Sequence, residues 1–258
     1  MNRIGSVILI AATTLGLAAG ASAQQKITVE VETKQTAQEQ LKYAEALSME
    51  LGRARNDAER EVAVVRAAAA FGAVRKHWPD DAPAYIRSVL MEGDLFHRAN
   101  APENVVRLLE PLQEWIRGNA NEPALLRRLA TAYGTLSRTK EAEDVFERAL
   151  QSKGGARHAE QAMLVHRAAA QFYSRGGRPR DAAVHYRHVM RDKRLREHLR
   201  ADAALDVLSA CIHANDRAAA RADLAEITAT VKQAMKAAAP ETAASLERHL
   251  ASLAAKVQ

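Results

Sequence analysis

The stretch LATAYGTLSRTKEAEDVFERAL, residues 129–150, decides the fold because its small and aromatic residues recur along the chain at constant spacing. Tyr133 is followed by Ala142, Phe146 and Ala149 at offsets of 9, 13 and 16 residues. The same offsets recur from Tyr173 (through Ala182, Tyr186 and Val189), from Phe96 (through Val105, Leu109 and Leu112) and from Cys211 (through Ala220, Leu224 and Ile227). The four starts are 37, 40 and 38 residues apart, which is typical of a solenoid of stacked units.

This spacing has a packing explanation. Ala142 and Ala182 open the second helix of a pair where it comes closest to the first, and a larger side chain there would hold the helices apart. The aromatic residues fill the space that widens along the pair. No catalytic role is needed to account for the pattern.

The composition and the positions of proline and glycine predict helices almost throughout. Ala, Leu, Arg and Glu dominate, prolines stand at the starts of apolar-periodic runs, and glycines follow their ends. We expect helices near 36–53, 57–77, 83–98, 102–117, 123–137, 140–152, 159–175, 179–193, 197–214, 217–237 and 241–256. Short turns join ten of them into five antiparallel pairs.

The pattern resembles the tetratricopeptide repeat family, most specifically over 123–150 and 163–190 and more weakly over 86–113 and 201–228. Leu126, Leu129, Ala130 and Tyr133 match its first helix, and Ala142, Phe146 and Ala149 match its second. The sequence departs from the family in its longer period, in Leu208 where a small residue is usual, and in His166 where a bulky apolar residue is usual. The resemblance implies an all-α, right-handed superhelical solenoid of antiparallel helix pairs, whose inner surface, lined by the first helix of each pair, holds a peptide or partner helix.

The N-terminus predicts a secretory signal peptide over 1–23. Met-Asn-Arg precedes an apolar stretch from Ile4 to about Ala19, and Ala21-Ser22-Ala23 resembles a cleavage site. We therefore expect export to the periplasm or the extracellular space, the bacterial envelope being favoured. The alternative is an uncleaved anchor that tethers the chain to the membrane as part of an envelope assembly complex.

Residues 24–35 are expected to form an extended, mostly disordered leader. Apolar and polar residues alternate from Lys26 to Glu32 as in a strand, so pairing with another chain is the alternative. Residues 36–239 then form the repeats, and residues 240–258 a capping helix with Leu246, Leu250 and Leu253 on one side. The rival use of this last helix is docking to a partner or to a second copy.

Charge and cysteine content limit the partners. The formal charge of +6 is spread through the chain, which argues only weakly for a nucleic-acid partner. We expect no binding of nucleic acid. Cys211 is the single cysteine, so no internal disulfide can form. Stability must therefore come from packing.

The repeat register selects candidate partner-binding residues on the flank of each first helix opposite its aromatic residue. In the groove we predict Arg87, Arg98, Arg127, Thr131, Arg167, Gln171 and Arg175 as partner-binding residues, and the further lining residues are Leu90, Asp94, Thr135, Asp202, Leu205, Ser209 and His213. Arginine holds carboxylates bidentately, so an acidic peptide or a terminal carboxylate is the specific hypothesis. A solvated arginine-rich face is the alternative. The Asn residues of the family's chaperone-tail clamp are missing, so that specificity is not carried over.

Other chemistry is weakly signalled. His185 and His188 share a helical face but lack further ligands at metal-like spacing, so we expect exposed histidines flanking a buried Tyr186, and we expect His166 to be a hydrogen-bonded core residue. The sequence contains no phosphate-binding glycine loop and no Gly-x-Ser-x-Gly nucleophile turn. We predict a non-catalytic scaffold or adaptor for protein partners, without cofactor or metal and without stable membrane insertion after cleavage.

Overall fold

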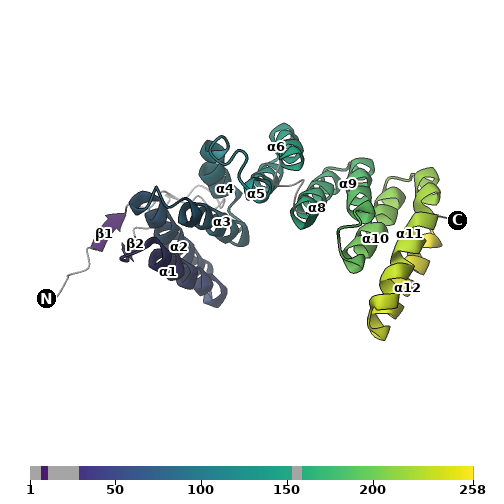
Figure 1. The fold of residues 1–258 in the computed structure, drawn as a ribbon, viewed down its shortest axis with the longest axis horizontal. Coiled ribbons are helices and arrows are strands. Elements are labelled where there is room, and N and C mark those ends of the chain that lie inside the picture. Colours follow the sequence, from purple (N-terminus) through teal and green to yellow (C-terminus); the bar gives the residue numbers. More distant parts are fainter. Residues whose placement is uncertain (1–6, 11–28, 153–158, 258) are drawn as a thin grey trace. The chain divides into compact units, whose positions relative to one another are not determined.

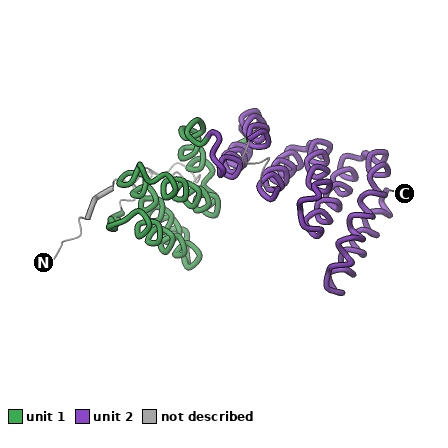
Figure 2. The backbone as a smooth tube through the Cα atoms, viewed as in Figure 1, with its two compact units in different colours: residues 1–116, 135–137 green, residues 117–134, 138–258 purple. Residues whose placement is uncertain are grey.

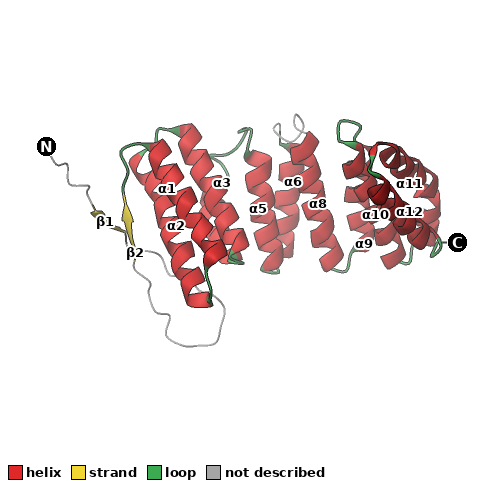
Figure 3. Cartoon of the chain, turned by 90° about the horizontal axis from the view of Figure 1, so that it is seen from below, coloured by secondary structure: helices red, strands yellow, loops and turns green. Residues whose placement is uncertain are grey.

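The computed structural model describes residues 7–10, 29–152 and 159–257, and these residues are mainly helical (Figure 1). In chain order the elements are β1 (Val7–Ile10), β2 (Val29–Glu32), α1 (Ala37–Glu50), η1 (Leu51–Arg53), α2 (Asp57–His77), α3 (Ala82–Arg98), α4 (Pro102–Leu109), η2 (Glu110–Leu112), α5 (Glu122–Thr135), α6 (Thr139–Gln151), α8 (Ala159–Arg175), α9 (Pro179–Arg191), α10 (Glu197–His213), α11 (Arg217–Ala237) and α12 (Pro240–Ala254). Among the described residues, β1 and β2 are the only strands (Figure 3).

The chain divides into two compact units (Figure 2). Unit 1 comprises residues 1–116 and 135–137, and unit 2 comprises residues 117–134 and 138–258.

In unit 1, β2 pairs antiparallel with β1, with Ile8 opposite Val31 and Ile10 opposite Val29. Val29 and Val31 are buried while Glu30 and Glu32 are exposed, as the alternation in sequence requires. The structure therefore corrects the expected mostly disordered leader over residues 29–32, which form a strand paired within the same chain. The other residues of the predicted signal peptide, 1–6 and 11–23, lie outside the described residues.

The segment after β2 is fastened to the first helix pair by Gln40, which is fully buried. Its side-chain oxygen accepts from the backbone N–H of Lys34 at 2.8 Å, and its amide donates to the carbonyl of Ala70 in α2 at 3.2 Å. Helix α1 begins at a Thr36 cap and α2 at an Asn56 cap, each accepting from a backbone N–H three residues on. Both bonds satisfy donors that a helix start leaves free.

The expected helix 102–117 is shorter in the structure. Helix α4 ends at Leu109 and passes into the short 3-10 helix η2, which contains Pro111. Proline lacks an N–H, and its ring clashes with the carbonyl four residues earlier in an α-helix. The turns that follow carry Trp115, which is 48% exposed and contacts the ring of Tyr85 at 4.6 Å between centroids.

Unit 2 contains a core cluster that extends from Met163 to Val257 and draws on α8, α9, α10, α11 and α12. Helices α9 and α11 both pack on α10, and α12 packs on α10 and α11. Leu246, Leu250 and Leu253 of α12 lie against the cluster. The apolar side of the last helix thus covers one end of the core.

The turn inside each of four helix pairs repeats the same geometry. A residue four positions after the start of each repeat has positive φ, namely Asn100, Ser137, Gly177 and Asn215. The next residue donates its N–H to the carbonyl of the repeat start: Ala101 to Phe96, Arg138 to Tyr133, Arg178 to Tyr173 and Asp216 to Cys211, at 2.8–2.9 Å. These bonds close a helix C-terminus around a left-handed residue. The backbone therefore shows the repeat frame independently of side-chain spacing.

Most of the predicted repeat positions are buried. Phe96, Tyr133, Ala142, Phe146, Ala149 and Ala182 are each at most 6% exposed. Tyr173 and Tyr186 are partly exposed instead of buried. Arg178 lies over the ring of Tyr173 at 4.6 Å, and Arg138 lies over Tyr133 at 4.3 Å, so a cation covers the same position in both repeats.

Candidate functional site

The predicted groove residues divide between the two units. In unit 1, Arg87 is exposed and forms an ion pair with Glu45 of α1 at 2.8 Å, while Arg98 at the end of α3 is exposed. Leu90 is partly buried, and Asp94 is exposed. Arg87 is thus partly neutralised by its own chain.

In unit 2, the predicted residues on α5 are less accessible than those on α8. Arg127 and Thr131 are partly buried, and the Thr131 hydroxyl donates to the carbonyl of Arg127 at 2.8 Å. That hydroxyl is therefore occupied within its own helix. Thr135 is exposed.

Arg167, Gln171 and Arg175 form a stripe along α8, which we call the α8 stripe. They stand at i, i+4 and i+8, so they share one face of the helix. Gln171 and Arg175 are exposed, whereas Arg167 is partly buried. Within the described residues, none of these three side chains forms an ion pair or a hydrogen bond with another residue.

Arginines on the second helices of unit 2, unlike those of the α8 stripe, form ion pairs. Arg148 of α6 pairs with the buried Glu122, Arg187 of α9 with the buried Asp223 at 2.7 Å, and Arg191 of α9 with Glu226 at 2.7 Å. Arg178 at the start of α9 pairs with Glu143 of α6. The two arginines of the α8 stripe therefore stand apart from these structural pairs, which link helices.

Helix α10 corrects one of the predicted groove positions. Leu205, predicted to line the groove, is 4% exposed and belongs to the core. The next residue, Asp206, was not predicted. Burial raises its pKa and the exposed Asp202 raises it further, while Arg167 and His249 oppose the rise. Arg167 of the α8 stripe thus acts on a carboxyl group of α10.

Ser209 and His213 lie further along α10 and bond to each other. The imidazole Nδ1 of His213 lies 2.7 Å from the carbonyl of Ser209 and 3.4 Å from its hydroxyl. Both contacts stay within one helical turn. His213 is exposed, and Ser209 is partly buried.

Three histidines gather between α8 and α9, which the sequence analysis did not predict. Nδ1 of His166 lies 3.0 Å from Nδ1 of His185, and the ring of His188 stacks on His166 at 4.7 Å between centroids. Burial, followed by the neighbouring His185 and His188, lowers the pKa of His166 from 6.5 to about 3, which a nearby Asp192 opposes. A usable signal was present, since His166 lies ten residues before Gly176 and His185 nine after it, which places them level across the helix hairpin.

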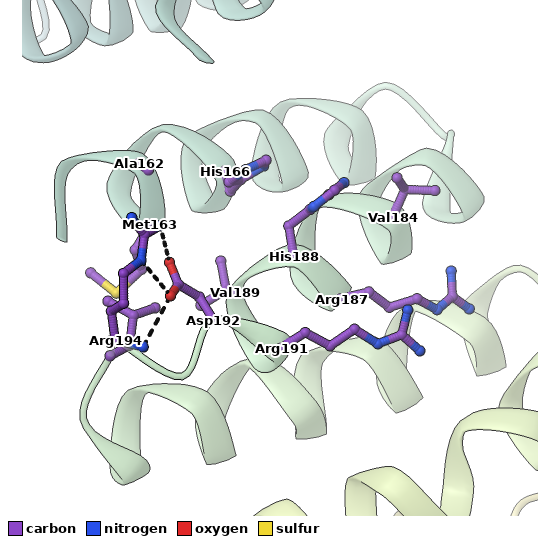
Figure 4. A pocket seen from close by; sticks show the side chains of 11 residues that line it. Ala162, Met163, His166, Val184, Arg187, His188, Val189, Arg191, Asp192 and Arg194 are labelled. Carbon is purple, nitrogen blue, oxygen red and sulfur yellow. Dashed lines mark hydrogen bonds and ion pairs between the residues drawn. The ribbon is translucent and has the colours of Figure 1, made fainter. Parts of the chain in front are cut away.

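A cleft of about 460 Å³ borders this cluster (Figure 4). His166 and His188 line it together with Arg187, Arg191, Asp192 and apolar residues such as Val184. Figure 4 shows the Asp192 carboxylate held by Arg194, whose Nη2 lies 2.7 Å from Asp192 Oδ2. Arg187 and Arg191 are engaged with α11, so the rings of His166 and His188 are the polar groups of this cleft without an ion pair among the described residues.

Cys211 has the environment of a packing residue. It is 2% exposed, and burial raises the pKa of its thiol, although Arg187 opposes the rise. A raised pKa disfavours the thiolate that nucleophilic chemistry requires. Within the described ranges, no helix is both long and apolar enough to cross a membrane.

The arrangement of helix pairs with repeated turns defines the class of the protein as an all-α helical repeat. The chain is similar to a solved structure, the crystal structure of MamA protein, with a TM-score of 0.50, 14% identity, and coverage of 77% of this chain and 96% of that one. No family model and no curated protein matches the sequence. The structural likeness shows the fold, so the predicted all-α helical-repeat architecture, like that of tetratricopeptide repeats, is confirmed.

Proposed function

We propose that this protein is an exported, non-catalytic adaptor that binds a protein partner through the α8 stripe of unit 2. The observation that carries the proposal is the contrast among the arginines of this unit. Arg167 and Arg175 have no intramolecular ion pair among the described residues, whereas Arg148, Arg187 and Arg191 on the second helices each hold a carboxylate. Cations that form no ion pair on one helix face are available to a ligand.

The chemistry of the α8 stripe favours an acidic segment or a terminal carboxylate as ligand. Arginine presents a planar fork of donors that matches a carboxylate bidentately. Residues eight apart on a helix lie about 12 Å apart along its axis. Arg167 and Arg175 therefore suit two carboxylates spaced by several residues in an extended partner, and Gln171 between them can bond to its backbone.

The carboxyl groups of α10 restrict how such a partner would lie. Arg167 and Asp202 both act electrostatically on Asp206, and the two carboxylates of α10 would repel an acidic chain that crossed from α8 to α10. The partner is therefore expected to run along α8 and not across it. Like charges placed in the wrong register disfavour competing partners.

The proposal includes export, for which the support is the sequence of residues 1–23, and cleavage there would remove β1 and leave β2 without that strand. The N-terminus of the protein recovered from cells tests this part. A chain that starts at Gln24 supports cleavage and a periplasmic or extracellular site. A chain retaining the segment from Ile4 to Ala19 supports the membrane-tethered alternative.

Binding of a fluorescent peptide of Asp and Glu with a free carboxyl terminus tests the α8 stripe. The double variant Arg167→Glu/Arg175→Glu should bind the peptide at least tenfold more weakly. Rising salt should weaken binding of the peptide to the unaltered protein. The matched control is Arg196→Glu/Arg217→Glu, which makes the same charge change at two exposed arginines outside the stripe. Equal loss in both variants would mean that net charge alone attracts the peptide, and equal binding by all three proteins would refute the proposed site.

A further inference from the structure

Two histidine nitrogens face each other between α8 and α9. Nδ1 of His166 and Nδ1 of His185 are 3.0 Å apart. Both side chains are partly buried, and they come from opposite sides of the hairpin whose turn contains Gly176 and Gly177. The helix pair therefore brings two potential metal ligands together that lie 19 residues apart in the sequence.

Stacking holds both rings in position. His185 stacks on Tyr173 with 5.3 Å between centroids and 9° between ring planes, and His166 stacks on His188 with 4.7 Å and 12°. Each histidine therefore has a neighbouring ring that limits its rotation. Ligands that are already oriented lose less conformational freedom when an ion binds.

We propose that His166 and His185 bind one divalent transition-metal ion of the Cu²⁺ or Ni²⁺ type through their Nδ1 atoms. Metal–nitrogen bonds of about 2.0 Å to two atoms 3.0 Å apart enclose an angle of about 97°. This is close to the right angle of square-planar or octahedral coordination, which Cu²⁺ and Ni²⁺ prefer. A tetrahedral ion would need the two nitrogens about 3.3 Å apart.

The protonation of the pair suits a metal ligand. Burial lowers the pKa of both His166 and His185, with His188 adding to the effect on each, whereas Asp192 opposes it at His166 and Asp181 opposes it at His185. Imidazole binds metals in its neutral form, so few protons have to be displaced near pH 7. Binding requires both rings to carry their proton on Nε2, which replaces the Nδ1 to Nδ1 hydrogen bond with two coordinate bonds.

The surroundings leave room for the remaining ligands. His166 borders the cleft of about 460 Å³, so one of the two rings is reached by water and ions from this side (Figure 4). No group of three or more His, Cys, Asp or Glu side chains in the described ranges is placed to hold an ion. His188 is stacked face to face on His166, so its nitrogens point elsewhere, and water completes the coordination.

Calorimetric titration of the full chain with Cu²⁺ tests this inference. We expect one site that weakens by at least tenfold in His166→Gln and in His185→Gln, because each loses half of the protein ligands. His213→Gln is the matched control, since that histidine is exposed and bonded only within its own helix turn. Helical circular dichroism establishes that each variant is folded.

Electron paramagnetic resonance of the Cu²⁺-loaded unaltered protein gives a reading that does not depend on any variant. Hyperfine structure from two equivalent nitrogens is expected for coordination by the pair. A spectrum with one nitrogen or none, or binding that is unchanged in the His166→Gln/His185→Gln double variant, would overturn the inference and leave the two rings joined by a hydrogen bond only.

Discussion

Truncation of Tyr133 tests the repeat frame most directly. Tyr133 and Tyr173 occupy the same repeat position, and each carries an arginine over its ring, but their burial differs. Tyr133 is 2% exposed, while Tyr173 is partly exposed. Replacing each by alanine should therefore have unequal effects on the free energy of unfolding, although the sequence pattern treats the two positions as equivalent.

The expected magnitudes come from this burial. A tyrosine side chain buries about 150–250 Å², and about 25 cal/mol per Å² gives an upper figure of roughly 4–6 kcal/mol. Measured truncations of large buried aromatics cost about 3–5 kcal/mol, which we expect for Tyr133→Ala. The Tyr173 side chain buries less area than that of Tyr133. Tyr173→Ala should therefore cost roughly half as much, about 1.5–2.5 kcal/mol.

Urea unfolding followed by helical circular dichroism measures both effects. Trp78 and Trp115 lie in unit 1, so tryptophan fluorescence in the same samples follows that unit separately. Tyr133 lies in unit 2, and its loss should shift the dichroism transition. A loss below about 1 kcal/mol for Tyr133→Ala, or a larger loss for Tyr173→Ala, would refute the assigned register.

Two further predictions follow from the glycines and from Asp206. A methyl group at Gly134 would lie 2.7 Å from Cδ2 of Phe172, so Gly134→Ala should destabilise by about 1 kcal/mol, whereas Gly72→Ala, whose new methyl would meet only Arg75 at 3.8 Å, should stabilise by about 0.5–1 kcal/mol. Urea unfolding compares the two, and a stabilising effect of Gly134→Ala or a destabilising effect of Gly72→Ala would contradict the packing. Burial raises the pKa of Asp206, so its native state holds a proton more tightly than the unfolded state, and stability falls as pH rises through the native pKa. Asp206→Asn should therefore stabilise the protein at pH 7 and lose this advantage at pH below the usual Asp range, as urea midpoints across pH will show.

The helices could be predicted closely because their signals are local. Prolines at Pro102, Pro179 and Pro240 stand at the first position of α4, α9 and α12, as expected for a residue without an N–H. The expected helix 102–117 was too long. The error arose at Pro111, because proline is acceptable at the start of a turn but breaks the interior of an α-helix.

The site was harder to predict because it depends on which residues meet across helices. The register placed Arg167, Gln171 and Arg175 on one face of α8, and the structure leaves two of them exposed. The same register put Leu205 in the groove, although it packs in the core beside the half-buried Asp206. Leu205 and Asp206 are adjacent in sequence and therefore about 100° apart around α10. An error of one residue in the register is enough to exchange a core position for a groove position.

The arginines of unit 2 show how one residue type can serve both stability and recognition. Arg187 and Arg191 on α9 reach Asp223 and Glu226 on α11, and their ion pairs join the second helices of consecutive repeats. Ion pairs between helices need a fixed register, so these arginines belong to the scaffold. Arg175 on α8 is exposed without such a pair among the described residues. Composition cannot separate the two roles, because the distinction lies in whether a carboxylate of the neighbouring repeat is within reach.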